Sequence, residues 1–300
     1  MFEIFKNRIE ITGILETVTA LRISAGRSTE AIGSDLPVIK DALGRPLIPG
    51  SSFKGALRSR LESFLRGIDE SFAANPALET EWSITQEAMS KFKHELVITR
   101  DKPKEKEEKL HQFILNKTDL ISFLFGSPWL SSKLQIRDLT VHKPEDNWFG
   151  QYQERDGVAI DRDTETAGDG KLYDFQIVPA GTPFDFHAIV ENAEEWELGL
   201  LTIGLQQFKT EQIPLGGGKS RGLGVVKLQI NDVKWIDVRD ANDKSKVDPN
   251  KVIEYLKKLI NSHGDLPCDD SIPLPYVWSE ALIHKLREEM EKVKNTVATN

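Results

Sequence analysis

Residues 31–65, with the sequence AIGSDLPVIKDALGRPLIPGSSFKGALRSRLESFL, constrain the fold of this chain more than any other stretch. Proline and glycine divide it into a loop, short extended pieces and a helix that begins after Gly50. Ser51 or Ser52 is expected to accept a backbone N–H at the start of that helix. Apolar residues then recur at helical spacing, which predicts a buried face: Phe53, Leu57, Leu61 and Phe64 or Leu65.

The rest of the chain predicts an α+β fold of the ferredoxin-like, or RRM-like, type. Alternating polarity predicts one long or two short strands within 2–23, and further strands at 134–141, 183–190 and 224–230. A helical period predicts an amphipathic helix at 194–208. The order strand, helix, strand, strand, helix, strand fits that fold, whose sheet leaves one face uncovered. The expected buried stripe of the second helix is Leu198, Leu201, Leu205 and Phe208.

We expect residues 1–236 to form a single domain with two excursions. Residues 68–119 are polar and include the charge-alternating stretch 101–109, which predicts inserted helices with a mobile loop around 100–110. Residues 143–182 predict a long β-hairpin that projects from the body. Residues 237–300 predict a C-terminal helical extension of two helices around a proline-broken link.

The distribution of charge is more informative than its total. A formal net charge of −8 argues against a protein coated in nucleic acid. Residues 40–66 nevertheless hold six basic residues against two acids, and residues 216–227 hold three basic residues and no acid. Because the local field decides where a phosphate chain lies, these two stretches together favour an RNA-binding surface. The alternative is that they are ordinary solvated charges of a helix and a loop.

Cysteine usage and hydropathy exclude several classes of protein. The single cysteine, Cys268, excludes an internal disulfide and a multi-cysteine structural zinc site. No apolar run approaches the roughly 20 residues of a membrane span. The N-terminal residues lack the basic head and apolar core of a secretory signal. We therefore expect a cytoplasmic protein with no membrane partner.

The glycine loop, residues 216–224 (GGGKSRGLG), connects the second predicted helix to the last strand. Glycine lets the backbone approach another molecule closely, and free N–H groups of Gly217 and Gly218 could form an anion-holding concavity. Lys219 and Arg221 add positive charge. The alternative is a tight turn with a bulge before a strand. The Gly-Lys-Ser/Thr order of a phosphate-binding P-loop is absent.

Asp35 lies in the stretch GSDLP at 33–37. Taken alone it is a loop aspartate, and most of those form turns. A lone carboxylate beside an RNA strand has two further uses. It can hold a hydrated divalent cation, or it can assist deprotonation of the 2′-hydroxyl that attacks the adjacent phosphate.

The run AIGSDLPVIKD…GRPLIPGSSFKGALRSRLE closely resembles the N-terminal signature of the RAMP superfamily, and in particular the backbone subunits of type III CRISPR effector complexes. Three further pieces match in order: LFG at 124–126, DRDTETAGDG at 161–170 followed by PFDF, and LGGGKSRGLGVV at 215–226. The resemblance covers roughly residues 3–232. The Asp35 loop is one residue shorter than the family pattern, and the insertion and the tail are longer than a minimal subunit needs.

The resemblance implies a ferredoxin-like palm that holds guide RNA, with residues 152–180 as a thumb that wedges between guide and target bases. It implies that Asp35 cleaves target RNA with a divalent metal ion, expected to be Mg²⁺, and leaves a 2′,3′-cyclic phosphate. It places guide-backbone contacts at Lys54, Arg58, Lys219 and Arg221, and we add Ser51, Ser52, Gly217 and Gly218, which border those cations. The implied partners are guide RNA, target RNA and neighbouring subunits.

Two other functions remain open at this point. The chain could be a structural RNA-binding subunit of the same complex whose Asp35 is not placed to cleave. It could also be an endoribonuclease that matures the guide, although the sequence shows no clear histidine dyad for such an activity.

Overall fold

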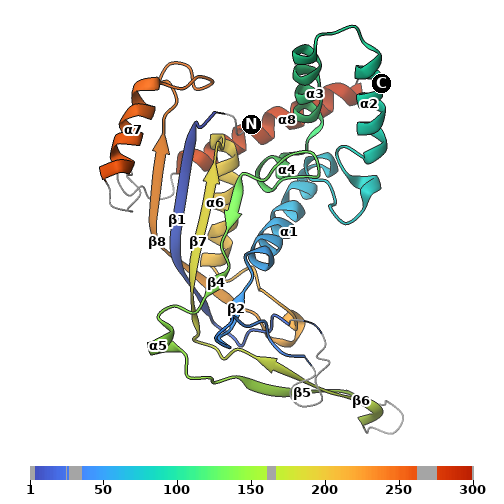
Figure 1. Ribbon diagram of the computed structural model, residues 1–300. Coiled ribbons are helices and arrows are strands. Elements are labelled where there is room, and N and C mark those ends of the chain that lie inside the picture. The colour runs from blue at the N-terminus through green and yellow to red at the C-terminus, as the bar shows by residue number, and fades with distance from the viewer. Residues whose placement is uncertain (1–3, 25, 27–35, 161–166, 262–275, 299–300) are drawn as a thin grey trace.

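The computed structural model describes all residues except 1–3, 25, 27–35, 161–166, 262–275 and 299–300 (Figure 1). Its centre is a four-stranded antiparallel sheet with the strand order β3-β7-β1-β8. The bounds are Asn7–Thr17 for β1, Leu134–Ile136 for β3, Pro183–Glu191 for β7 and Val226–Asp237 for β8. Every second side chain of β1 is buried, because successive side chains point to opposite faces of a sheet.

A register shift between Thr12 and Gly13 bends β1 against β8. A Cβ atom at Gly13 would lie 2.2 Å from the carbonyl oxygen of Gln229, so only glycine fits this close approach. The last strand is longer than the predicted 224–230, because it continues its pairing with β1 as far as Asp237.

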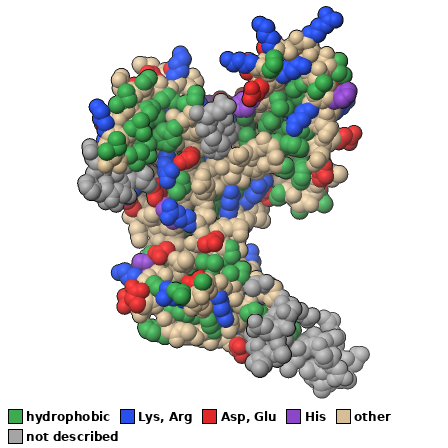
Figure 2. Space-filling model, in the orientation of Figure 1, with side chains coloured by type: hydrophobic (Ala, Val, Ile, Leu, Met, Phe, Trp, Pro, Cys, Tyr) green, Lys and Arg blue, Asp and Glu red, His purple; other side chains and the backbone are tan. Residues whose placement is uncertain are grey.

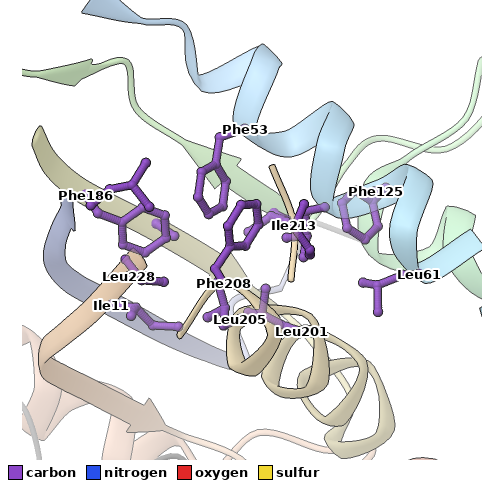
Figure 3. Packing of buried hydrophobic residues seen from close by; sticks show 14 of the residues in the cluster. Ile11, Phe53, Leu61, Phe125, Phe186, Leu201, Leu205, Phe208, Ile213 and Leu228 are labelled. Carbon is purple, nitrogen blue, oxygen red and sulfur yellow. The ribbon is translucent and has the colours of Figure 1, made fainter. Parts of the chain in front are cut away.

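Two helices pack together on one face of the sheet: α1 (Gly50–Ile68) and α6 (Glu195–Lys209). The ring of Phe53 on α1 stacks on Phe208 of α6 at 4.1 Å and packs against Phe186 of β7 at 5.0 Å (Figure 3). A Cβ atom at Gly204 would lie 2.3 Å from Leu57, so glycine at this position lets the two helices approach closely. The predicted stripe of α6 is confirmed, since its four members are buried: Leu198, Leu201, Leu205 and Phe208.

The start of α1 differs from the prediction. Pro49 precedes the helix, and neither Ser51 nor Ser52 caps it, so the predicted serine cap is wrong. The first N–H, that of Gly50, donates instead to Asp138 Oδ1 at 2.8 Å. Of the two residues predicted for the end of the buried face of α1, Phe64 is 40% exposed and Leu65 is buried.

The predicted strand 134–141 is two short strands. After β3 the chain leaves the central sheet, and β4 (Leu139–Thr140) pairs with β2 (Leu47–Ile48) in a separate two-stranded sheet. Asp138 lies between β3 and β4, where its carboxylate holds Gly50. The chain therefore passes from the central sheet to the two-stranded sheet at Asp138, the residue that also fixes the start of α1.

The predicted hairpin is confirmed as β5 (Gln153–Ile160) paired with β6 (Ala167–Ile177), preceded by the short helix α5 (Pro144–Asn147). It projects from the body at the end of the molecule opposite α2 and α3 (Figure 1). A bridge between Val178 and Leu21 joins its base to the segment that follows β1.

The insertion contains 3-10 turns at Glu70–Phe72 (η1) and Glu79–Glu81 (η2), followed by α2 (Gln86–Ile98), α3 (Pro103–Lys117) and α4 (Leu120–Phe125). The predicted mobile loop around 100–110 is wrong, because α3 begins at Pro103. Proline is favoured in the first turn, and the carboxylate of Glu105 accepts the N–H of Lys102 at 3.1 Å. Phe92 stacks on Phe113 at 4.0 Å and holds α2 against α3.

The C-terminal part contains α7 (Pro249–Asn261) and α8 (Tyr276–Ala298). The second of these packs along α6, where Trp278 and Leu282 are buried in the main core. A Cβ atom at Gly199 would lie 2.0 Å from the carbonyl oxygen of Trp278, which shows how close the two helices are. Among the described helices, none has the length and apolar character needed to cross a membrane.

Candidate nucleic-acid interface

The glycine loop folds as a tight turn seated on the segment that follows β1. Its short 3-10 helix, Lys219–Arg221 (η3), lies between Gly218 and Gly222, both in the left-handed region. The N–H of Gly217 donates to Arg22 O at 2.8 Å, and that of Gly224 donates to Ala20 O at 2.9 Å. These internal bonds correct one expectation: the N–H of Gly217 is not free to hold an anion. The loop instead presents Lys219 and Arg221, which are both exposed.

Two neighbouring glycines of this loop give a matched test of that geometry. Gly216 has φ +72°, and a Cβ atom there would lie 2.1 Å from Arg22 O, whereas nothing lies within 4 Å of such an atom at Gly217. We expect Gly216→Ala to lower the free energy of unfolding by roughly 1–3 kcal/mol. We expect Gly217→Ala to change it by less than about 0.5 kcal/mol. Urea denaturation of the two variants measures the difference, and equal values would contradict the loop's placement on Arg22.

The hairpin base, the glycine loop and the end of the Asp35 loop meet in one small apolar cluster. Its buried members are Ala20, Phe175, Ile177 and Leu223, with Leu36 and Tyr173 packed against them. Leu36 forms a parallel bridge with Phe175, and the N–H of Gln176 donates to Leu36 O at 3.1 Å. Asp35 itself lies outside the described residues, but it is bonded to Leu36. Three stretches that are distant in sequence are therefore joined here.

Cations surround this cluster. The guanidinium of Arg22 lies 4.6 Å from the ring centroid of Phe175, and Arg221 Nη1 donates to the hydroxyl of Tyr173 at 3.0 Å. That hydrogen bond, with the charge behind it, lowers the pKa of Tyr173 and raises the pKa of Arg221. Lys219 projects from the same loop. Sequence reasoning missed Arg22, because only the fold brings it beside the aromatic hairpin base.

The cations of α1 are held by other contacts. The ammonium of Lys54 donates to Ser132 Oγ at 2.6 Å and to Leu134 O at 2.9 Å. Burial, together with the nearby Arg58, lowers the pKa of Lys54 to about 8. Arg58 Nε donates to Glu62 at 2.7 Å. Lys54 therefore braces the segment that enters β3.

The structure brings together only part of the predicted RNA-binding set. Lys219 and Arg221 lie with the hairpin base, whereas Lys54 and Arg58 contact segment 126–134; no described hydrogen bond or ion pair joins the two pairs. Ser51 is exposed and Ser52 is half-buried at the start of α1. On the face seen in Figure 2, basic side chains alternate with acidic and hydrophobic ones and form no continuous basic patch. On this face, therefore, the cations occur in local groups.

The sheet face away from α1 and α6 carries paired charges. Glu10 and His187 lie 2.6 Å apart, and Arg8 contacts Glu191 at 2.7 Å. Burial, and then the charge of Arg137, lowers the pKa of His187, whereas Glu10 acts in the opposite direction. The side chains that β1 directs to this face include no aromatic residue on which a base could stack: Arg8, Glu10, Thr12, Ile14 and Glu16. This composition favours the loops over the sheet as the place for RNA.

We next consider whether the described residues could hold a metal ion. Within the described ranges, no group of three or more His, Cys, Asp or Glu side chains is arranged to hold a metal ion. Asp35, the predicted metal-binding residue, lies outside those ranges.

Comparisons with known proteins give a consistent family. The family model of the RAMP superfamily matches residues 14–227. The CRISPR system Cms endoribonuclease Csm3 of Methanocaldococcus jannaschii is 28% identical over 269 residues, which cover 85% of this chain and 92% of that protein. The protein of the same name from Enterococcus italicus is 29% identical over 243 residues, covering 77% of this chain and 94% of that protein. The one from Mycobacterium tuberculosis is 45% identical over 71 residues, or 23% of this chain and 30% of that protein.

Proposed function

Because this chain belongs to the RAMP superfamily, we propose that it is a guide-RNA-binding backbone subunit of a type III CRISPR effector complex that cleaves complementary target RNA. One observation carries the proposal: the glycine loop, the hairpin base and the residue after Asp35 meet in a single cluster bordered by exposed cations. That arrangement provides a place for a phosphate backbone beside a potential cleaving group.

The architecture supports a ferredoxin-like palm with a thumb. The six core elements run strand, helix, strand, strand, helix, strand, and the strand order β3-β7-β1-β8 is the one that this fold requires. The hairpin β5-β6 occupies the place of the thumb, and its base contacts both Leu21 and Leu36. A thumb anchored at this point can insert beside an RNA strand held by the glycine loop.

Guide binding depends on phosphate contacts that do not read sequence, since base pairing supplies the specificity of a guided complex. Arg22 and Arg221 are the first candidates because they contact the hairpin base, and Lys219 is exposed on the same loop as Arg221. An ammonium has three donors, and the two described bonds of Lys54 leave its third N–H for a phosphate oxygen. Arg58 has donors beyond its bonds to Glu62 and Gly126.

Cleavage is assigned to Asp35, which is bonded to the anchored Leu36. A thumb that unstacks the target frees a 2′-hydroxyl to align with its own phosphate, and such positioning supplies much of the rate. Asp35 would assist loss of the hydroxyl proton and hold a divalent ion, expected to be Mg²⁺. Such an ion neutralises negative charge that develops on the phosphate. A structural subunit with an inactive Asp35, or a guide-maturing endoribonuclease, is the competing function.

The salt dependence of guide binding tests the proposed phosphate contacts. For Lys219→Ala/Arg221→Ala we expect weaker guide binding and a slope of log K against log salt that is shallower by about 1.4, since each contact with a single strand contributes roughly 0.7. The matched control is Lys91→Ala/Lys104→Ala, which removes two exposed cations from α2 and α3 and should leave the slope unchanged. Equal slopes for the wild type and the first variant would contradict phosphate contact by Lys219 and Arg221.

The lowered pKa of Lys54 gives guide binding a pH dependence. With a pKa of about 8, Lys54 is mostly charged at pH 7 and about one-tenth charged at pH 9. If its charge binds phosphate, guide affinity should fall by up to about tenfold between these pH values. In Lys54→Arg the side chain stays charged at pH 7 and at pH 9, so the affinity of this variant for the guide should stay nearly constant. Equal losses in both proteins, measured by fluorescence anisotropy at fixed salt, would show that Lys54 makes no such contact.

A further inference from the structure

A cavity of about 400 Å³ lies between α1, the insertion and the loop that follows α4. We call it the Trp129 pocket. Its walls include Arg58, Trp82, Ile84, Phe125 and Trp129, together with several serines. No residue of the glycine loop or the hairpin lines it. Ligand pockets in proteins range from about 300 to 1,000 Å³, so this volume suits a small ligand.

The two indole rings of the pocket are oriented by hydrogen bonds. Trp129 Nε1 donates to Ile84 O at 2.9 Å, and Trp82 Nε1 donates to Pro76 O at 3.2 Å. These bonds use the only polar atom of each ring, so the rings offer a ligand apolar surface alone. Both rings are half-buried, so part of each remains accessible. Fixed and accessible indole surfaces favour a flat aromatic ring as the ligand.

The charge around the pocket favours a ligand that carries an anionic group. Glu62 contacts two guanidinium groups, Arg58 at 2.7 Å and Arg66 at 3.5 Å, so one carboxylate faces two positive charges. Lys93 adds a third, with its ammonium 5.4 Å from the ring centroid of Trp129. The carboxylate of Asp119 accepts hydrogen bonds from the hydroxyl of Ser83 and from the N–H of Ser122 in α4. Among the described residues that line the pocket, Arg58 is the only charged one, so the lining itself carries a positive charge.

We propose that the Trp129 pocket binds a single nucleotide, either as a free nucleoside monophosphate or as the terminal nucleotide of an RNA strand. The base lies against the indoles, and the phosphate lies toward Arg58. The hydroxyl of Ser131, which is exposed among the lining residues, can donate to a polar edge of the base or the sugar. This site is separate from the glycine loop and does not depend on the proposed cleavage of target RNA, although it shares Arg58 with the proposed guide contacts.

Isothermal titration of the purified full chain with 5′-AMP and 5′-UMP tests the proposal. We expect saturable binding, weakened at least tenfold in Trp129→Leu and unchanged in the control Trp148→Leu, because Trp148 lies next to β5 and lines no part of the pocket. Arg58→Gln should weaken 5′-AMP but not adenosine. Because Trp129→Leu could disturb folding, Ser131→Phe provides a second variant: it adds bulk at an exposed rim position and should block the pocket.

A second titration distinguishes a free nucleotide from the end of an RNA strand. It uses a short RNA that carries a 5′-phosphate or a 3′-phosphate. Binding of that RNA alone assigns the pocket to an RNA end, and binding of free 5′-AMP as well assigns it to the nucleotide itself. Either result supports the proposal. Lys219→Ala/Arg221→Ala should bind 5′-AMP normally even if it loses the guide, which separates the pocket from the proposed guide contacts of the glycine loop. The proposal is overturned by no saturable binding of any probe, by equal binding in Ser131→Phe, or by weakened subunit assembly as the only effect of Ser131→Phe.

Discussion

Replacement of Asp35 by asparagine is expected to abolish cleavage of target RNA at the position served by this subunit, with a loss of roughly 10²–10⁴-fold in rate. That range is what a positioned proton-transfer group contributes. Asparagine keeps the size of the side chain and removes its charge, so the variant should retain the guide and still bind target. The measurement is the rate of appearance of cleavage products from end-labelled target RNA in the assembled complex.

A matched control comes from Asp185→Asn. Asp185 is an exposed aspartate on β7 that pairs with His142. The Asp185→Asn variant should cleave target RNA at the wild-type rate. If Asp35→Asn also cleaves at that rate while its guide content is unchanged, the chain is a structural subunit and the catalytic assignment is lost. Cutting of precursor guide RNA by the isolated protein would instead support the maturation enzyme.

Loss of Lys133 is expected to give the largest change in stability. Its ammonium donates to both carboxylate oxygens of Glu197 at 2.7 Å, and the two side chains are 5% and 1% exposed. Glu197 also accepts the N–H of Glu194 at the start of α6. Removing one partner of a buried ion pair leaves an uncompensated charge, so Lys133→Met should lose about 3–5 kcal/mol of unfolding free energy. Chemical denaturation measures this loss.

The ion-pair account also predicts a partial rescue. Lys133→Met/Glu197→Leu should recover much of the loss because no charge remains buried, although the bond to Glu194 is not restored. Burial already raises the pKa of Glu197, whereas Lys133 lowers it, so the pKa should rise further in Lys133→Met. A raised carboxyl pKa means that stability falls as pH increases, so the deficit of Lys133→Met should shrink toward acidic pH. A double variant as unstable as the single one would show that packing, rather than charge, is at stake.

Periodicity in the sequence was sufficient to predict the local elements of the core. The helical spacing from Phe53 to Leu65, the stripe of α6 and the long hairpin all follow from patterns within one segment. Helices were predicted in the insertion, but the first turns of α3 were predicted as a loop because their charge-alternating sequence resembles a solvated loop, whereas Phe92 and Phe113 pack the helix against α2. The start of α1 was misjudged because its N–H partner, Asp138, lies 88 residues away.

The sequence predicted which residues belong to the candidate site better than it predicted how they are arranged. The glycine loop and its cations were evident, since glycines and basic residues are concentrated there. That Leu36 pairs with Phe175, and that Lys54 braces Ser132 and Leu134, are long-range contacts that no local pattern encodes. Arg22 joins the site for the same reason, because the fold places it beside the hairpin base.

Photocrosslinking of a guide RNA substituted with 4-thiouridine, followed by mass spectrometry of the attached peptides, tests the central claim most directly. The claim is that RNA follows the glycine loop and the hairpin base. We predict crosslinks in residues 215–224 and in the base of β6 around Tyr173, with fewer in Lys219→Ala/Arg221→Ala. Crosslinks confined to the open sheet face, at Thr12, Ile14 and Asp185, would contradict the account.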